Sequence, residues 1–191
     1  MGILNLPDEY SEIKRVDIQK DKKLALLVNI GAILIAIPLF IIGAIITPIN
    51  YEIVYGNFLS SILTLVYLLV TVLIFCVVHE LIHGVFFKLF SGKKVKYGFT
   101  GVYAFAGSEA YFNKREYLVI GLSPVIFLGI ILLFLTILLT NEWFWRVYLI
   151  QIINLSGAAG DIYITRFMSK LPDDVLIKDE GIAMTIYSRI K

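Results

Sequence analysis

Long blocks of apolar residues without a single charge constrain this chain more than any other feature. The first runs from Leu24 to Thr47, and two more run from Phe58 to Val78 and from Tyr117 to Leu139. As a helix the first block is about 36 Å long, which exceeds the hydrocarbon thickness of a bilayer, about 30 Å. These blocks therefore predict three helices that span a membrane.

A fourth span is predicted from Trp143 to Phe167. Its hydropathy is weaker because it carries Gln151, Asn154, Asp161 and Arg166. Composition agrees with a membrane protein, since 59% of the residues are hydrophobic and only 17% are charged, whereas a soluble domain has about a quarter charged residues. The predicted fold class is an all-α membrane protein with about four transmembrane helices.

The basic residues indicate how these spans are oriented. Four spans place both termini on one side, and sixteen of the 17 Lys and Arg residues lie on that side or at helix ends facing it; Arg146 lies opposite. Because positive charge concentrates in cytoplasmic loops, we expect a multi-pass protein of the cytoplasmic membrane with both termini in the cytoplasm. The chain then divides into a cytoplasmic amino-terminal segment (1–23), a transmembrane metallopeptidase-like domain (24–167) and a cytoplasmic tail (168–191). The polar first 20 residues predict no cleaved signal peptide.

The segment between the second and third spans has a different pattern. Apolar and aromatic residues alternate with others in Val95–Phe99 and Val102–Phe105, and Thr100-Gly101 separates the two runs. This pattern predicts a small cytoplasmic β-hairpin-like insertion. Asn113, followed three residues later by Glu116, is typical of a capping box that opens the third helix.

The most informative chemical pattern is His79-Glu80-Leu81-Ile82-His83, an HExxH sequence at the end of the second span. Residues four apart lie on one face of a helix, so both imidazoles can bind one cation. Imidazole nitrogen suits Zn²⁺, and Glu80 can take a proton from water that the metal activates. The two histidines could instead only mark where the helix leaves the membrane. We favour a zinc site, because ionisable groups inside membrane helices are costly and are functional candidates by default.

A catalytic zinc needs a third protein ligand, and the chain has no further histidine. Asp161 is the favoured candidate, because it lies about as far from the cytoplasmic end of the fourth span as His83 does from the end of the second. Asn154 shares a helical face with Asp161 and could hydrogen-bond substrate or help to hold developing charge; the alternative is a simple packing contact. Glu109, in the cytoplasmic loop, is the rival third ligand.

Other noticeable residues have simpler interpretations. Cys76 is the only cysteine, so no internal disulfide can form, and we expect a buried structural thiol one turn before His79. Lys93, Lys94 and Lys96 are interpreted as a topology signal that contacts anionic headgroups. Nucleic acid is not expected as a partner.

The HExxH sequence and the Asn154–Asp161 segment resemble the membrane proteins grouped as putative zincin peptidases, which are similar to site-2 protease-like intramembrane zinc metallopeptidases. In that class an HExxH on one transmembrane helix meets an Asp from a later helix, near an Asn-containing motif. The resemblance implies that His79, His83 and Asp161 bind Zn²⁺ and that Glu80 is the general base.

The resemblance extends from the second span to the tail. The chain departs from the site-2 protease pattern at Gly157, where that class usually has Pro. It also has Gly160-Asp161-Ile162 where Leu-Asp-Gly is usual.

These observations predict a membrane-embedded zinc metallopeptidase that hydrolyses peptide bonds at or within the membrane near its cytoplasmic face. Its expected partners are the lipid bilayer and a membrane-associated protein or peptide substrate. The alternative is a non-catalytic integral membrane protein with a structural or transport-related metal site, or a scaffold that has kept the motif without activity. A transporter would more often show internal repeats and several polar spans.

Overall fold

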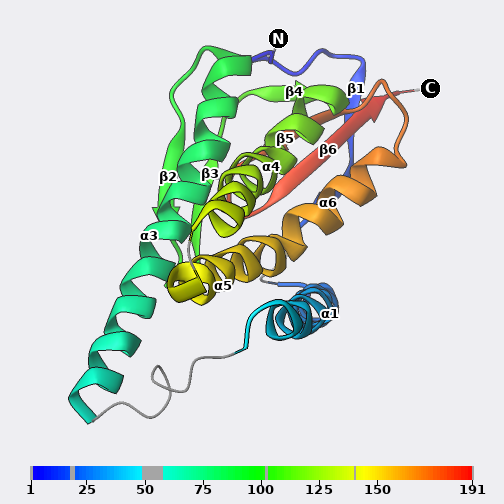
Figure 1. Cartoon of the computed structure of the whole chain (residues 1–191). Helices are drawn as coiled ribbons and strands as arrows, with labels where there is room; N and C mark the ends of the chain where they lie inside the picture. The colour runs from blue at the N-terminus through cyan, green and yellow to red at the C-terminus, as the bar shows by residue number, and fades with distance from the viewer. Residues whose placement is uncertain (1, 18–19, 49–57, 102, 140, 191) are drawn as a thin grey trace.

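The computed structural model describes residues 2–17, 20–48, 58–101, 103–139 and 141–190, apart from the side chains at 141 and 142. Within them, four helical stretches are long and apolar enough to cross a membrane. These comprise α1 (Lys22–Ile46), α3 (Phe58–Ser91), α4 (Lys114–Leu138), and α5 (Asn141–Gly157) together with α6 (Ala159–Ser169) (Figure 1). The prediction of four helices with the character of membrane spans is confirmed. Most of the loop 48–57, together with Val102 and Thr140, lies outside the described residues.

The starts of two spans are set by capping residues. Asp21 Oδ1 accepts hydrogen bonds from the backbone N–H groups of Lys23 and Leu24, each 3.0 Å long, at the start of α1. At the start of α4, Asn113 and Glu116 form a reciprocal capping box. Such caps satisfy backbone donors that have no partner within the helix, and the predicted capping box is confirmed.

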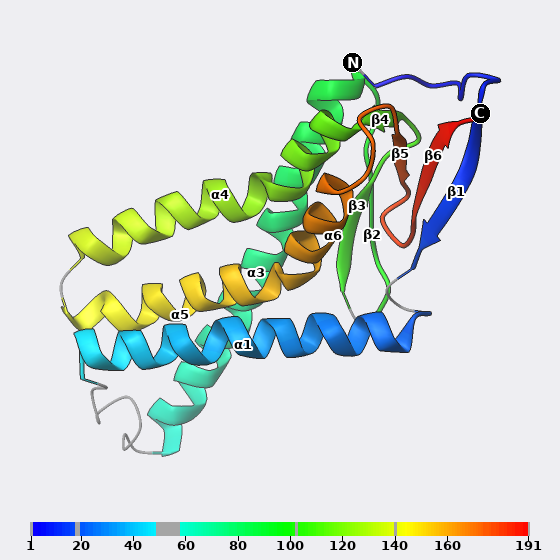
Figure 2. The ribbon, with the colours of Figure 1, turned by 90° about the vertical axis from the view of Figure 1, so that its right-hand side faces the viewer.

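The helices pack as a bundle in which α5 lies between α1 and α4, while α3 crosses at a steeper angle (Figure 2). Gly43 of α1 makes room for the ring of Tyr148, whose hydroxyl donates to the carbonyl of Leu39 at 2.8 Å. The most apolar windows of α1 and α3 contain no buried residue. Exposed apolar surface of this extent marks an interaction with protein or lipid, and lipid fits the length of both helices.

A four-stranded antiparallel sheet lies at one end of the bundle and joins distant parts of the chain. Its strand order is β1-β6-β5-β4, formed by β1 (Tyr10–Val16), β4 (Tyr111–Asn113), β5 (Leu176–Asp179) and β6 (Met184–Arg189). Both terminal segments, expected only as polar extensions, therefore pair with each other in one sheet. An all-α description is incomplete at this end of the molecule.

The predicted hairpin between the second and third spans is present. Strand β2 (Lys96–Phe99) pairs antiparallel with β3 (Ala104–Gly107). Gly101 has a φ of +90° in the turn, a conformation that glycine adopts without steric cost. The second strand begins at Ala104, and Val102 lies outside the described residues.

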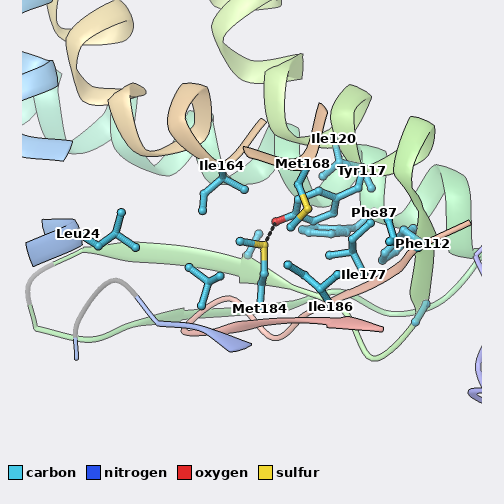
Figure 3. Close-up of a cluster of buried hydrophobic side chains, with 14 residues drawn as sticks. Leu24, Phe87, Phe112, Tyr117, Ile120, Ile164, Met168, Ile177, Met184 and Ile186 are labelled. Carbon is cyan, nitrogen blue, oxygen red and sulfur yellow. Dashed lines mark hydrogen bonds between the residues drawn. The ribbon is translucent and has the colours of Figure 1, made fainter. Parts of the chain in front are cut away.

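The main core fills the space between the sheet and the helix ends above it (Figure 3). Phe87, Tyr117 and Met168 enter it from three different helices, and Ile177 and Ile186 enter it from the sheet. All five side chains are buried. This core fixes the ends of α3, α4 and α6 relative to one another, and those ends carry the chemically interesting residues.

The fourth span differs from the continuous helix that the sequence predicts. It breaks at Ala158, which separates α5 from α6 and has φ −80° and ψ 11°. Gly157 precedes the break, and glycine is among the residues at which sharp helix kinks occur. The break places Asp161 in the first turn of a new helix, where the dipole of the helix stabilises a carboxylate.

Candidate metal centre

The two histidines lie on one face of α3, one turn apart. Their ring centroids are 5.0 Å apart and the rings are nearly perpendicular. One ligand atom from each of His79, Glu80 and His83 can be chosen so that all three lie within 4.8 Å of one another. Helical spacing alone produces this cluster, so the sequence was sufficient to predict it.

Asp161 of α6 reaches the same two imidazoles. Its Oδ2 atom lies 3.1 Å from His79 Nε2 and 3.7 Å from His83 Nε2. The side chains of both histidines are largely buried, with 14% and 11% of their surface exposed, and that of Asp161 is 30% exposed. A carboxylate from the fourth span therefore meets the HExxH pair of the second span in a partly enclosed position.

The orientation of His83 is set by α4. Its Nδ1–H donates to the backbone carbonyl of Ile120 at 2.9 Å, which leaves Nε2 directed at Asp161. That carbonyl is available because Pro124, four residues later within α4, has no N–H with which to bond it. Ser123 donates its hydroxyl to the same carbonyl at 2.8 Å. Pro124 thus leaves the Ile120 carbonyl free to accept the hydrogen bond from His83. No local pattern in the sequence links these residues.

Glu80 is held by the hairpin. Its Oε2 atom accepts a hydrogen bond of 2.7 Å from the backbone N–H of Ala106 in β3. The hairpin packs closely on α3 at Gly84, where an added Cβ would lie 1.9 Å from the hydroxyl oxygen of Tyr97. The position after His83 therefore needs a residue without a side chain if β3 is to stay beside Glu80.

Asn154 makes a different contact from the one expected of a substrate-binding residue. Its Nδ2–H donates to the carbonyl of Val125 at 3.3 Å, and Gln151 makes a similar bond of 3.3 Å to the carbonyl of Gly129. Asn154 lies seven positions before Asp161, in α5 and on the other side of the break at Ala158. Asn154 Oδ1 is buried and has no hydrogen-bond partner among the described residues.

Glu109 and Cys76, which the sequence placed near the metal centre, are both exposed. Glu109 lies near the start of β4 and is exposed, and its carboxylate pairs with Lys96, which lowers its pKa below the usual value. The contact to the histidines that was considered for Glu109 is instead made by Asp161. Cys76 was expected to be buried, and that is wrong: it is exposed on α3, a helix whose most apolar window contains no buried residue.

A second acidic group lies in the sheet below α4. Asp179 of β5 accepts a 2.6 Å hydrogen bond from the hydroxyl of Tyr117 and a 2.8 Å bond from the N–H of Gly181. Burial raises the pKa of the Asp179 carboxyl above its usual value. This pair has no signal in the sequence, because no local pattern connects α4 with the carboxyl-terminal tail.

The donor types and the two distances between carboxylate and imidazole are compatible with a zinc ion. Zinc bonds to imidazole nitrogen and carboxylate oxygen are about 2.0–2.2 Å long, so two ligands of a tetrahedral ion lie about 3.3–3.5 Å apart. The distances from Asp161 Oδ2 to the two Nε2 atoms, 3.1 and 3.7 Å, bracket that value. Two neutral imidazoles and one carboxylate, with a glutamate beside them, are also typical donors and neighbours for catalytic zinc.

Part of the chain is similar in sequence to known proteins. A 125-residue stretch is 30% identical to a protein of Pyrococcus woesei described as "Uncharacterized 24.7 kDa protein in gap 5'region". The match covers 62% of this chain and 53% of that protein, so the chain spans about half the length of this relative. No solved structure matches the chain. Residues 70–176, which include the HExxH sequence and Asp161, match the family described as "Putative zincin peptidase", and the chain belongs to that family.

Proposed function

We propose that this protein is a membrane-embedded zinc metallopeptidase, similar to site-2 proteases, that cleaves peptide bonds near the cytoplasmic face of the membrane. One observation carries the proposal: a carboxylate oxygen of α6 lies 3.1 and 3.7 Å from the two imidazoles of the HExxH helix. In this proposal His79, His83 and Asp161 hold the zinc ion. Three protein ligands leave the fourth position of a tetrahedral ion open for catalysis.

The bound metal supplies a Lewis acid that polarises a carbonyl and makes water a stronger acid. Glu80 acts as the general base that removes the proton from the attacking water and returns it to the amine that leaves. The hydrogen bond from Ala106 to Glu80 Oε2 supports this role, because it holds the carboxylate in one orientation next to the histidines. Positioned proton transfer of this kind typically contributes a factor of about 10² to 10⁴ to the rate.

The substrate is proposed to be an extended segment of a membrane-associated protein or peptide. A helical substrate hides its carbonyl groups in its own hydrogen bonds, so the bond to be cut must be unwound. Strand β3 is a candidate template because it pairs with β2 along one edge and contacts Glu80 from the other. Edge addition to β3 would bring an extended backbone beside the glutamate.

Asn154, in α5 just before the break that leads to Asp161, is proposed to help bind the substrate. Its Oδ1 atom is buried without a hydrogen-bond partner among the described residues, and such an atom costs free energy unless something pairs with it. Because Asn154 is 1% exposed, a backbone N–H of the substrate would provide that partner only after the helices around Asn154 move apart. Asn154→Leu should therefore weaken cleavage without removing zinc.

The deciding experiment measures zinc content and peptide cleavage in parallel. The protein would be purified in detergent in non-chelating buffer, analysed for metal, and incubated with a mixture of unstructured peptides that is then examined by mass spectrometry. Glu80→Gln should retain about one zinc per chain and lose cleavage, whereas Asp161→Ala should lose both. Glu109→Gln is the matched control, because it removes an exposed carboxylate that pairs with Lys96, and it should change neither.

The outcomes separate the proposal from its alternative. Cleavage that persists in Glu80→Gln would contradict the role of that residue as the base. Stoichiometric zinc without cleavage by the wild-type protein on any peptide would favour a structural or transport-related metal site. Wild-type protein that binds no zinc would overturn the proposal altogether.

A further inference from the structure

A cavity of about 630 Å³ lies away from the metal centre, where β1 meets the start of α1 and the side of α6. Figure 2 shows β1 descending to the first turn of α1, with α6 close by. Helix α1 begins at Lys22, and α6 ends at Ser169. Because these are the ends of the first and fourth candidate spans, the cavity opens at the level where a membrane meets water.

The polar wall of the cavity carries an excess of positive charge. Four basic residues line it against two acidic ones, which leaves a formal charge of +2. Within this set Lys20 lies 3.7 Å from Asp17, and the charge falls to +1 when Glu180, 3.5 Å from Arg15, is counted as well. One of the acids, Asp21, already caps α1 by accepting from the N–H groups of Lys23 and Leu24. The cavity therefore attracts an anion through its basic side chains. Asp21 already occupies two of the backbone N–H groups at the start of α1, so these donors do not provide the main attraction.

The other wall is apolar and aromatic. Leu24, Leu27, Tyr163 and Phe167 line it, and Leu27 is exposed on the outer surface of α1. The ammonium group of Lys14 lies 4.4 Å from the centroid of the Phe167 ring, so one basic side chain is already held against this wall by a cation–π contact. The apolar side of the cavity continues onto a helix surface that faces lipid.

We propose that this cavity binds the phosphodiester headgroup of an anionic phospholipid, with an acyl chain lying along the exposed side chain of Leu27. A volume of about 630 Å³ falls in the usual range for small-molecule sites, about 300–1,000 Å³. Basic pockets between membrane helices bind such headgroups in other proteins. The apolar wall favours a lipid over free phosphate, because a phosphate ion would leave that wall in contact with water.

The test compares two pairs of lysines that carry the same charge. Lys20→Gln/Lys23→Gln removes two charges from the cavity, and the side chain of Lys20 is 88% exposed, so the change should not disturb folding. Lys93→Gln/Lys94→Gln removes two charges from the exposed segment before β2, which does not line the cavity. These two lysines are expected to attract anionic headgroups only at the protein surface, so this variant measures the effect of surface charge without the cavity. Binding of phosphatidylglycerol and of phosphatidylcholine to detergent-solubilised protein would be measured by native mass spectrometry and by the rise in Tm.

We expect the wild-type protein and Lys93→Gln/Lys94→Gln to bind phosphatidylglycerol more tightly than phosphatidylcholine. Lys20→Gln/Lys23→Gln should bind phosphatidylglycerol about tenfold more weakly or worse, since each lysine near a membrane surface contributes about 1 kcal/mol. Equal losses in both double variants would show a general surface-charge effect and overturn the site. Complete displacement of the lipid by millimolar inorganic phosphate or glycerol phosphate would assign the cavity to a soluble anion and overturn the lipid assignment.

Discussion

His83 donates its Nδ1–H to the backbone carbonyl of Ile120, 2.9 Å away on the neighbouring helix. A helix carbonyl normally accepts from the N–H four residues later, and here that position is Pro124. The third span therefore carries an acceptor that its own backbone cannot use, at the height of the HExxH pair. Partners of this kind fix the tautomer and the ring orientation of a metal-binding histidine.

Replacing Pro124 by alanine should weaken zinc binding. The new N–H would bond the Ile120 carbonyl within α4 and compete with His83, and loss of such an orienting partner typically costs about 10- to 100-fold in metal affinity or activity. Competition with a chelator of known affinity measures the change. Pro38→Ala is the matched control, because Pro38 lies inside α1, away from both histidines, and it should leave zinc affinity unchanged. Equal zinc affinity in Pro124→Ala and wild type would contradict the orienting role of the Ile120 carbonyl.

Replacing Gly84 by alanine should lower activity more than zinc content. The added methyl group would collide with Tyr97, whose hydroxyl oxygen would be 1.9 Å away, so the hairpin and Ala106 must move away from Glu80. Gly31→Ala is the control. Its added Cβ would lie at an ordinary 3.9 Å from the nearest atom, the Cβ of Ala159, so this change should be tolerated. Gly84→Ala/Tyr97→Ala should recover part of the lost activity. Failure of this second change to help would argue that the hairpin does not hold Glu80.

The stability of the protein should depend on pH through Asp179. Its pKa is raised in the folded state, so its contribution to stability is fully present below the usual aspartate pKa, about 3.9. That contribution is lost as pH rises through the folded pKa. The Tm of the wild type relative to Asp179→Asn should therefore decline with rising pH across this window.

Asp173 provides a control of opposite sign. Its exposed carboxylate pairs with Lys114 at 3.0 Å, and this contact lowers its pKa. Any contribution of Asp173 to the stability of the fold is present above the usual aspartate pKa. It is lost as pH falls through the lowered pKa of the folded state. The Tm difference between wild type and Asp173→Asn should therefore change in the other direction. Parallel pH profiles for the two variants would contradict the assignment for Asp179.

The orientation predicted from the basic residues can be tested with single cysteines. Because Cys76 is the only cysteine, Cys76→Ser supplies a background without thiols. Lys93→Cys should react with a membrane-impermeant maleimide only in vesicles that expose the cytoplasmic face, and Arg146→Cys only in vesicles of the opposite orientation. Labelling of both cysteines from one side would contradict the four-span topology.

Features that depend on neighbours in the chain were predictable. The apolar blocks predicted the spans because crossing a bilayer requires about 20 apolar residues in sequence. The HExxH pair, the capping box at Asn113 and the turn at Gly101 also arise from local spacing and backbone preference. Each of them involves residues at most a few positions apart, so periodicity was sufficient.

Features that join distant segments were only partly predictable. Similar depth along the two spans favours Asp161 over Glu109 as the partner of the histidines. Only the packing of α6 against α4, which in turn packs against α3, shows Asp161 beside them. Three other contacts had no signal in the sequence. They are the hydrogen bond from His83 to the Ile120 carbonyl, the hydrogen bond from Ala106 to Glu80, and the pairing of β1 with β6. Backbone N–H and C=O groups are much the same at every residue. The sequence therefore does not reveal which of them lacks a backbone partner or lies close to a distant side chain.

Local sequence alone predicted four stretches long and apolar enough to cross a membrane, and one helix that presents two imidazoles and a glutamate close together. These follow from hydrophobicity and helical period, which act along the chain. Tertiary structure decided which carboxylate meets the imidazoles, which carbonyl orients His83, and that both termini close into one sheet. These depend on contacts between segments far apart in the chain, and the local pattern of either segment does not encode its partner.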